Sequence, residues 1–120
     1  MADKRPMSSF EKAPRDLVER FTEVMTTRPA GAVRKMFGYP AAFVNGNMAT
    51  GLHGERWFVR LSATDTAELV GLGGGPFEPM PGRPMRGYTV LPPSIAEDPG
   101  AAGAWVDRAL DHVGGLPPKG

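Results

Sequence analysis

The 120-residue sequence has no cysteine, no long apolar run and almost no excess of charge of either sign. Without cysteine there is no disulfide framework, no thiolate nucleophile and no cysteine-ligated zinc. Residues 1–9 carry charges with no apolar segment behind them, so we expect no signal peptide and a cytoplasmic location. Lys and Arg number 14 against 13 Asp and Glu. This balance disfavours a nucleic-acid binder or a polybasic membrane anchor.

Residues that could form a catalytic or metal site are also scarce. The histidines His53 and His112 have no second ligand at zinc spacing, and we expect both to be solvated. No G-x-S-x-G nucleophile motif occurs. The glycine-rich stretch 71–75 lacks the Lys-Ser/Thr of a phosphate-binding loop and instead predicts a helix end. We therefore expect no catalytic residues, no metal and no cofactor, and do not expect an enzyme.

The sequence does contain amphipathic segments. Apolar residues at helical spacing predict a first helix that starts near Pro14 and a last helix opened by Asp98 and Pro99. Residues 33–61 alternate with period two and contain Asn45-Gly46, a strong hairpin signal, so they predict a four-stranded antiparallel meander. The first of these strands is expected to run from Val33 to Phe37.

Two shorter segments complete the predicted order. Ser62 to Asp65 resembles a capping box and predicts a short helix, and residues 86–91 predict a last strand. The order is α-β-β-β-β-α-β-α. It predicts an α+β fold whose mainly antiparallel sheet, a four-stranded meander plus one later strand, packs against the N- and C-terminal helices. We expect a single domain over residues 13–114 between flexible tails at 1–12 and 115–120.

The period of two also assigns side chains to the faces of the sheet. In the third strand it places Met48, Thr50 and Leu52 together on one face. In the fourth strand it places Arg56, Phe58 and Arg60 on one face and Trp57, Val59 and Leu61 on the other.

Four stretches resemble the TfoX/Sxy N-terminal domain family: RKMFG at 34–38, AFVNGNMA at 42–49, ERWFVRLS at 55–62 and PMPGRPMRGYTVLP at 79–92. The resemblance implies a small α+β domain with a mainly antiparallel sheet and offers no catalytic residues. Founding members regulate natural competence, are thought to act alongside the cyclic-AMP receptor protein, and carry a second, C-terminal helical domain. This chain ends soon after its last predicted helix, so we expect a single-domain member lacking that domain. The MmcQ/YjbR-type proteins are a weaker match with a related architecture.

The proline-rich stretch 76–84 leads into the least ordinary side chains of the sequence. Prolines restrict the backbone there, and a rigid group of cationic and apolar side chains binds partners at low entropic cost. The candidate site consists of Arg83, Met85, Arg86 and Tyr88, with Arg56 and Arg60 from the fourth strand. The plainer alternative is an ordered connection whose arginines pair with nearby carboxylates.

Two functions remain open. The first is a non-catalytic interaction or regulatory module with a protein partner, or a homodimer formed through sheet edges. The alternative is a small-molecule or anion-binding protein, including an enzyme of unknown class, that uses the Arg83–Tyr88 loop. Direct nucleic-acid binding and membrane attachment are not expected.

Overall fold

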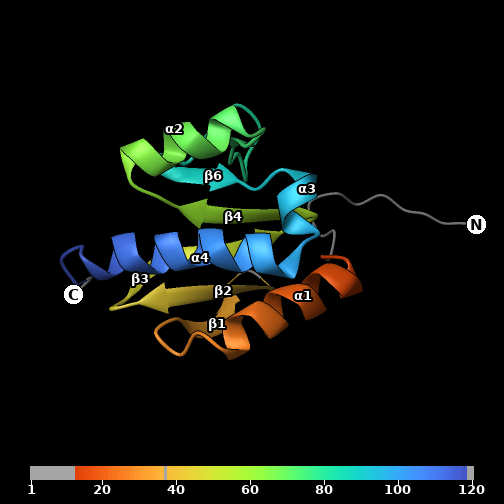
Figure 1. The fold of residues 1–120 in the computed structure, drawn as a ribbon, viewed down its shortest axis with the longest axis vertical. Helices are drawn as coiled ribbons and strands as arrows, with labels where there is room; N and C mark the ends of the chain where they lie inside the picture. The colour runs from red at the N-terminus through yellow and green to blue at the C-terminus, as the bar shows by residue number, and fades with distance from the viewer. Residues whose placement is uncertain (1–12, 37, 119–120) are drawn as a thin grey trace, which may run out of the picture.

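The computed structural model describes residues 13–36 and 38–118 (Figure 1). The predicted N-terminal tail at 1–12, the predicted strand residue Phe37 and the last two residues of the predicted C-terminal tail lie outside the described residues. The helices and strands follow in the order α1 (Arg15–Thr26), β1 (Ala32–Met36), β2 (Tyr39–Val44), β3 (Asn47–His53), β4 (Arg56–Arg60), α2 (Ala63–Gly71), β5 (Gly75–Pro76), β6 (Tyr88–Val90), α3 (Pro93–Ala96) and α4 (Pro99–Gly114).

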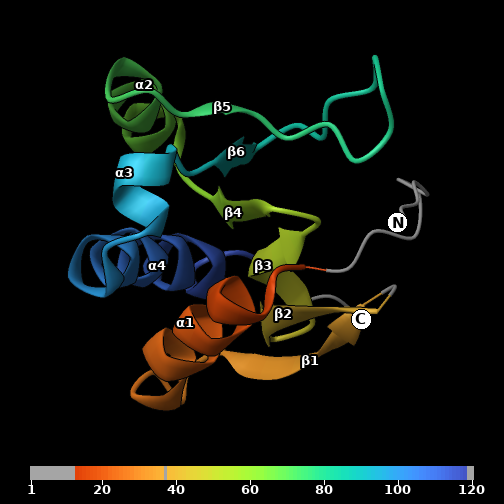
Figure 2. The same cartoon turned by 90° about the vertical axis from the view of Figure 1, so that its right-hand side faces the viewer.

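The strands form one antiparallel sheet in the order β1-β2-β3-β4-β6-β5. The helices lie on one side of this sheet, and the loop of residues 77–87 extends on the other side (Figure 2). The α+β class and the four-stranded meander are thus confirmed. Two small elements were not predicted, because the two residues of β5 and the four of α3 are too short to show a period. No helix within the described residues is long and apolar enough to cross a membrane.

The core lies between the helices and the sheet. Asp98 caps α4 by accepting a hydrogen bond from the Gly100 amide at 3.0 Å, with Pro99 as the first helical residue, as predicted. The apolar stripes of both long helices are buried: Leu17, Phe21, Val24 and Met25 of α1, and Ala102, Trp105, Val106, Ala109, Leu110 and Val113 of α4.

One aromatic contact joins α1 to the centre of the sheet. The ring of Phe21 lies 5.3 Å from that of Trp57 on β4, and both side chains are at most 1% exposed. The indole N–H would cost free energy if it were buried without a partner. Trp57 Nε1 donates to Thr50 Oγ1 at 3.0 Å, and that hydroxyl donates to the Phe58 carbonyl at 2.7 Å. The largest fully buried side chain of the domain's described residues therefore has its N–H hydrogen-bonded.

A β-bulge in β3 changes the face on which Met48 lies. Phe43 pairs with Met48 and Ala42 pairs with Thr50, so Ala49 is an extra residue between two pairs. The prediction that Met48 shares a face with Thr50 and Leu52 is wrong, because a bulge shifts the alternation by one residue. Met48 instead lies on the face opposite to the helices.

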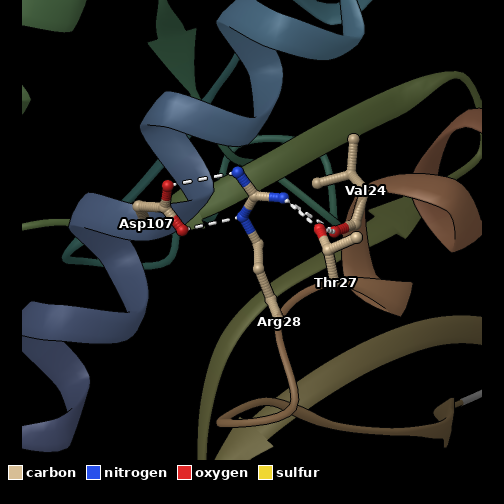
Figure 3. Close-up of polar contacts among 4 residues, drawn as sticks. All are labelled: Val24, Thr27, Arg28 and Asp107. Atoms are coloured by element: carbon tan, nitrogen blue, oxygen red, sulfur yellow. Dashed lines mark hydrogen bonds and ion pairs between the residues drawn. The ribbon is translucent and has the colours of Figure 1, made fainter.

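Arg28 connects the end of α1 to α4 (Figure 3). Its Nε and Nη2 donate to the two carboxylate oxygens of Asp107 at 2.7 and 3.1 Å, and its Nη1 donates to the Val24 carbonyl at 2.9 Å. A cation at a helix C-terminus also offsets the negative end of the helix dipole. Gly103 gives this side chain room, since a Cβ there would lie 2.6 Å from Arg28 Nη2.

We expect Arg28→Ala to lower the free energy of unfolding by about 1–2 kcal/mol in urea denaturation. Charge-assisted hydrogen bonds contribute about 1.5–3 kcal/mol, and solvent at the exposed Asp107 weakens the pair. Arg20→Ala is the matched control, since its one ion pair among the described residues, with Asp16, is 3.6 Å long and lies within one helix. It should cost about 0.5 kcal/mol or less. Equal losses in the two variants would contradict the role assigned to Arg28.

Candidate functional site

The sheet has one face without a helix over it among the described residues, here called the open face. It carries Phe43, Gly51, Phe58 and Tyr88, and the loop of residues 77–87 lies on its side (Figure 2). A pocket of about 570 Å³ opens there between the strands and this loop. Its wall includes Met36, Tyr39, Ala41, Phe43, Asn47, Met48, His53, Phe58, Arg60, Phe77, Pro79, Met80, Met85 and Tyr88.

Stacked aromatic rings form one side of the pocket. Phe77 of the loop stacks on Phe58 of β4 with ring centroids 4.2 Å apart and an interplanar angle of 17°. Tyr88 meets Phe58 edge-on at 5.6 Å. Gly51 on the neighbouring strand makes room for this arrangement, because a Cβ there would lie 2.8 Å from Phe58 Cζ. The loop is therefore anchored on the sheet by the burial of Phe77, which is 3% exposed.

Backbone hydrogen bonds fix the shape of the loop. The Met85 amide donates to the Phe77 carbonyl at 2.8 Å, and the Arg83 amide donates to the Met80 carbonyl at 2.9 Å across a turn. Gly82 in that turn has φ of 78°, a conformation that favours glycine. The loop thereby holds Met80 and Met85 in the pocket wall although these side chains are 63% and 37% exposed.

Tyr88 ties the loop end to the middle of the sheet. Its hydroxyl donates to the Met48 carbonyl at 3.0 Å, and the Arg60 guanidinium lies 5.6 Å from its ring centroid. Burial raises the pKa of Tyr88, since it disfavours the phenolate, and Arg60 opposes this rise. Tyr88 is consequently a neutral hydrogen-bond donor at physiological pH.

His53 is not the solvated turn residue that the sequence predicted. It ends β3 on the open face, with its ring 5.0 Å from Tyr39 and 5.7 Å from Phe77. Its Nδ1 atom is buried without a hydrogen-bond partner in the structure. Burial lowers the pKa of His53, and the charge of Arg56 lowers it further. The sequence could not show this environment, because Phe77 reaches His53 from a distant loop.

The predicted site residues divide into two groups. Arg60, Met85 and Tyr88 lie together in the pocket wall, whereas Arg56, Arg83 and Arg86 are exposed and outside it. Sequence reasoning missed the aromatic side chains of Tyr39 and Phe77 and the methionines Met36 and Met80. The alternation of β4 did place Phe58 between Arg56 and Arg60 on the face opposite to Trp57, and the register of the sheet agrees.

A second hollow, of about 510 Å³, lies near the end of α1 and along α4. Its wall contains Arg28, Asp107 and Arg108. Arg28 is paired with Asp107, and Arg108 is paired with Asp65 and Glu68 on α2 at 3.2 and 2.9 Å. Because both arginines of this hollow are already paired with carboxylates, the open-face pocket is the stronger candidate site. Among the described residues there is no group of three or more His, Asp or Glu that could hold a metal ion.

Comparison with protein-family models gives one finding. The model for the TfoX N-terminal domain matches residues 23–113, which include every element from β1 to α3 and most of α4. Comparisons with curated proteins and with solved structures gave no match.

The environment of His53 makes stability depend on pH. The unfolded chain binds the proton near the ordinary value of 6.5, while the folded chain binds it only at lower pH. As the pH falls below about 6.5, His53 gains its proton in the unfolded chain before it does so in the folded chain. The free energy of unfolding should therefore fall with pH in this range. We expect urea denaturation between about pH 7.5 and 5.5 to show this fall, and His53→Gln to reduce it. His112→Gln is the control; if it flattened the profile as much as His53→Gln, the assignment would be wrong.

Proposed function

This chain belongs to the TfoX N-terminal domain family, and we propose that it is a non-catalytic binding module that takes a small molecule into the open-face pocket. The single observation that carries the proposal is a hollow of about 570 Å³ with apolar walls and few polar groups. Small-molecule sites are typically about 300–1,000 Å³ with this composition. In this proposal the domain has no catalytic activity, and binding of the small molecule is what gives it an interaction or regulatory role.

The polar groups of the pocket favour binding over catalysis. They are Asn47, His53, Arg60 and the two tyrosines, and no carboxylate is present in the described part of the wall. A histidine that acts as a general base is commonly oriented by an acid beside it. The charge that acts on His53 is the cation of Arg56, which opposes protonation of the ring. This set of groups orients a ligand by hydrogen bonds and charge and supplies no paired acid and base.

Methionine side chains give the pocket an adaptable wall. Met36, Met48, Met80 and Met85 surround the aromatic rings, and the thioether chain adjusts to ligands of different shape. Met80 is 63% exposed, so most of its apolar surface is not covered by the described residues. Contact with a bound ligand accounts for two such methionines on one ordered loop.

We expect at least one compound from a panel of aromatic and medium-chain aliphatic molecules to raise the melting temperature. At a concentration one hundred times its Kd, a ligand stabilises the folded state by about 2.7 kcal/mol, which corresponds to roughly ten degrees for a domain of this size. Met48→Trp puts a much larger side chain in the pocket wall and should abolish the rise.

Val70→Trp is the matched control, since Val70 is 52% exposed on α2, away from the pocket. It should keep the ligand-dependent rise. If no compound shifts the melting temperature up to about 1 mM, the weak end of specific binding, the proposed function is wrong. An equal response of the Met48→Trp variant and the wild type would place the ligand elsewhere.

A second candidate function is self-association through the edge strand β1. Among the described residues this strand pairs only with β2, and its exposed residues are Ala32, Val33, Arg34 and Lys35. Unpaired edge groups are a template for another strand, and pairing of two β1 strands would continue the antiparallel sheet across a two-fold axis. The apolar Val33, which is 50% exposed at this edge, favours the pairing.

We expect light scattering with size exclusion to give a mass of two chains for the wild type and of one chain for Val33→Asp. A carboxylate at this position opposes its own copy across the two-fold axis, and like charges destabilise a strand pair. Val70→Asp, at a valine of nearly equal exposure on α2, should remain dimeric. A wild-type monomer at about 1 mM chain would exclude this second function.

A further inference from the structure

The near-neutral net charge hides a separation of charge between the two sides of the domain. Among the described residues, the sheet with its turns and the loop of residues 77–87 carry six cations and two acids, a balance of +4, whereas the helices and their flanking residues carry four cations and nine acids, a balance of −5. The acids of the helical side are Asp16, Glu19, Glu23, Asp65, Glu68, Glu97, Asp98, Asp107 and Asp111.

The ion pairs show the same difference between the helical side and the sheet side of the domain. Every ion pair among the described residues lies on the helical side, where Arg20, Arg28 and Arg108 each meet a carboxylate. Within the same described residues, no carboxylate pairs with Arg34 or Arg60 on the open face. The alternative expectation from the sequence, that the arginines of this region pair with nearby acids, therefore has no support among these contacts.

Arg60 is the cation that reaches into the pocket itself. It lies in the pocket wall, half-buried, with its guanidinium held against the Tyr88 ring. Arg34 stands at the other side of the pocket, 4.1 Å over the ring of the wall residue Phe43. A guanidinium presents a fork of N–H donors that matches carboxylate and phosphate oxygens.

We infer that the ligand of the open-face pocket is an organic anion, with an apolar body among the aromatic and methionine side chains and an oxyanion head on Arg60. This inference rests on the proposed function, since it names the chemical class of the molecule that the pocket takes. The head group is a carboxylate or a phosphate ester. Arg34 is the second cation available to a ligand with a longer reach.

His53 contributes a hydrogen-bonding group and no positive charge. Its ring stays neutral at physiological pH because burial and Arg56 both disfavour protonation. The charge complementarity of the pocket therefore comes from arginine, which holds its charge at every physiological pH. Binding of a carboxylate should accordingly depend little on pH above the titration range of the ligand itself.

Single-stranded nucleic acid is the competing occupant for a surface with arginines and aromatic rings. Proteins that bind single strands stack bases on accessible ring faces. Here Phe43, Phe58 and Phe77 are only 6%, 3% and 3% exposed, since other side chains cover their faces. Each ring contributes only a small exposed area to the hollow, so a compact apolar body that contacts several rings and methionines at once fits the observations better than a strand that stacks its bases on single ring faces.

The test compares an acid with its neutral amide. In isothermal titration of the wild type, naphthaleneacetate should bind at least about tenfold more tightly than naphthaleneacetamide, because only the acid gains a charge-assisted contact with Arg60. Naphthyl phosphate separates the two head groups, and inorganic phosphate alone tests whether the apolar body is needed. Arg60→Gln should remove the difference between acid and amide, and Arg60→Lys should restore part of it.

Arg20→Gln is the matched control, a half-buried arginine on the helical side, and it should keep the full difference. Equal affinity of acid and amide for the wild type would overturn the inference and leave the proposed function standing. Absence of binding by both, together with no response to the compound panel, would refute the proposed function as well. Tighter binding of a single-stranded oligothymidylate than of any small acid would overturn the inference in favour of nucleic acid.

Discussion

The packing of α1 and α4 onto a single face of the sheet is the constraint on which the rest of the molecule depends. Phe21 and Trp57 meet at its centre, and Thr50 satisfies the indole N–H without breaking the apolar layer. Because the two long amphipathic helices are used on one side, the sequence has no helix left for the other side among the described residues. The open face must be covered by a loop, and a loop with prolines covers it only in part. The pocket is a consequence of this shortage of helix.

Local patterns were enough to predict the helices and the meander. The stripe of α4, the Asp98 cap and the Asn45-Gly46 turn are each encoded within a few residues, and each has one structural solution. The wall of the pocket is encoded differently. Phe77 stacks on Phe58, and the Tyr88 hydroxyl reaches the Met48 carbonyl, 40 residues away. Contacts between residues so far apart in the sequence follow from the topology of the sheet, which places β6 beside β4. No periodicity in the sequence shows them. This is why Arg60, Met85 and Tyr88 could be named in advance while Tyr39 and Phe77 could not.

The bulge at Ala49 shows that a correctly predicted strand can still have side chains assigned to the wrong face of the sheet. Residues 47–53 do form a strand, yet one extra residue reverses the face of everything before it. Met48 thereby joins the pocket, and its carbonyl becomes the acceptor that holds Tyr88. Small residues such as Ala49 tolerate the crowding of a bulge inside a core. An alanine between two pairing positions was compatible with a bulge, but the alternation alone did not require one.

Net charge is a poor guide to the partners of this domain, because it averages two faces that a ligand never meets together. The exposed acids of the helices and the arginines of the open face lie on opposite sides of two packed layers, and interactions between solvent-exposed charges farther apart than the Debye length of about 8 Å at physiological ionic strength are largely screened. An anion at the open face is therefore influenced mainly by the charges of the sheet and the loop, and much less by the acids of the helices. Those acids are in part neutralised by Arg20, Arg28 and Arg108, which hold the helical side together. The arginines of the open face have no such structural task among the described contacts. Their charge is available to a ligand because the stability of the fold is supplied by the other side of the sheet.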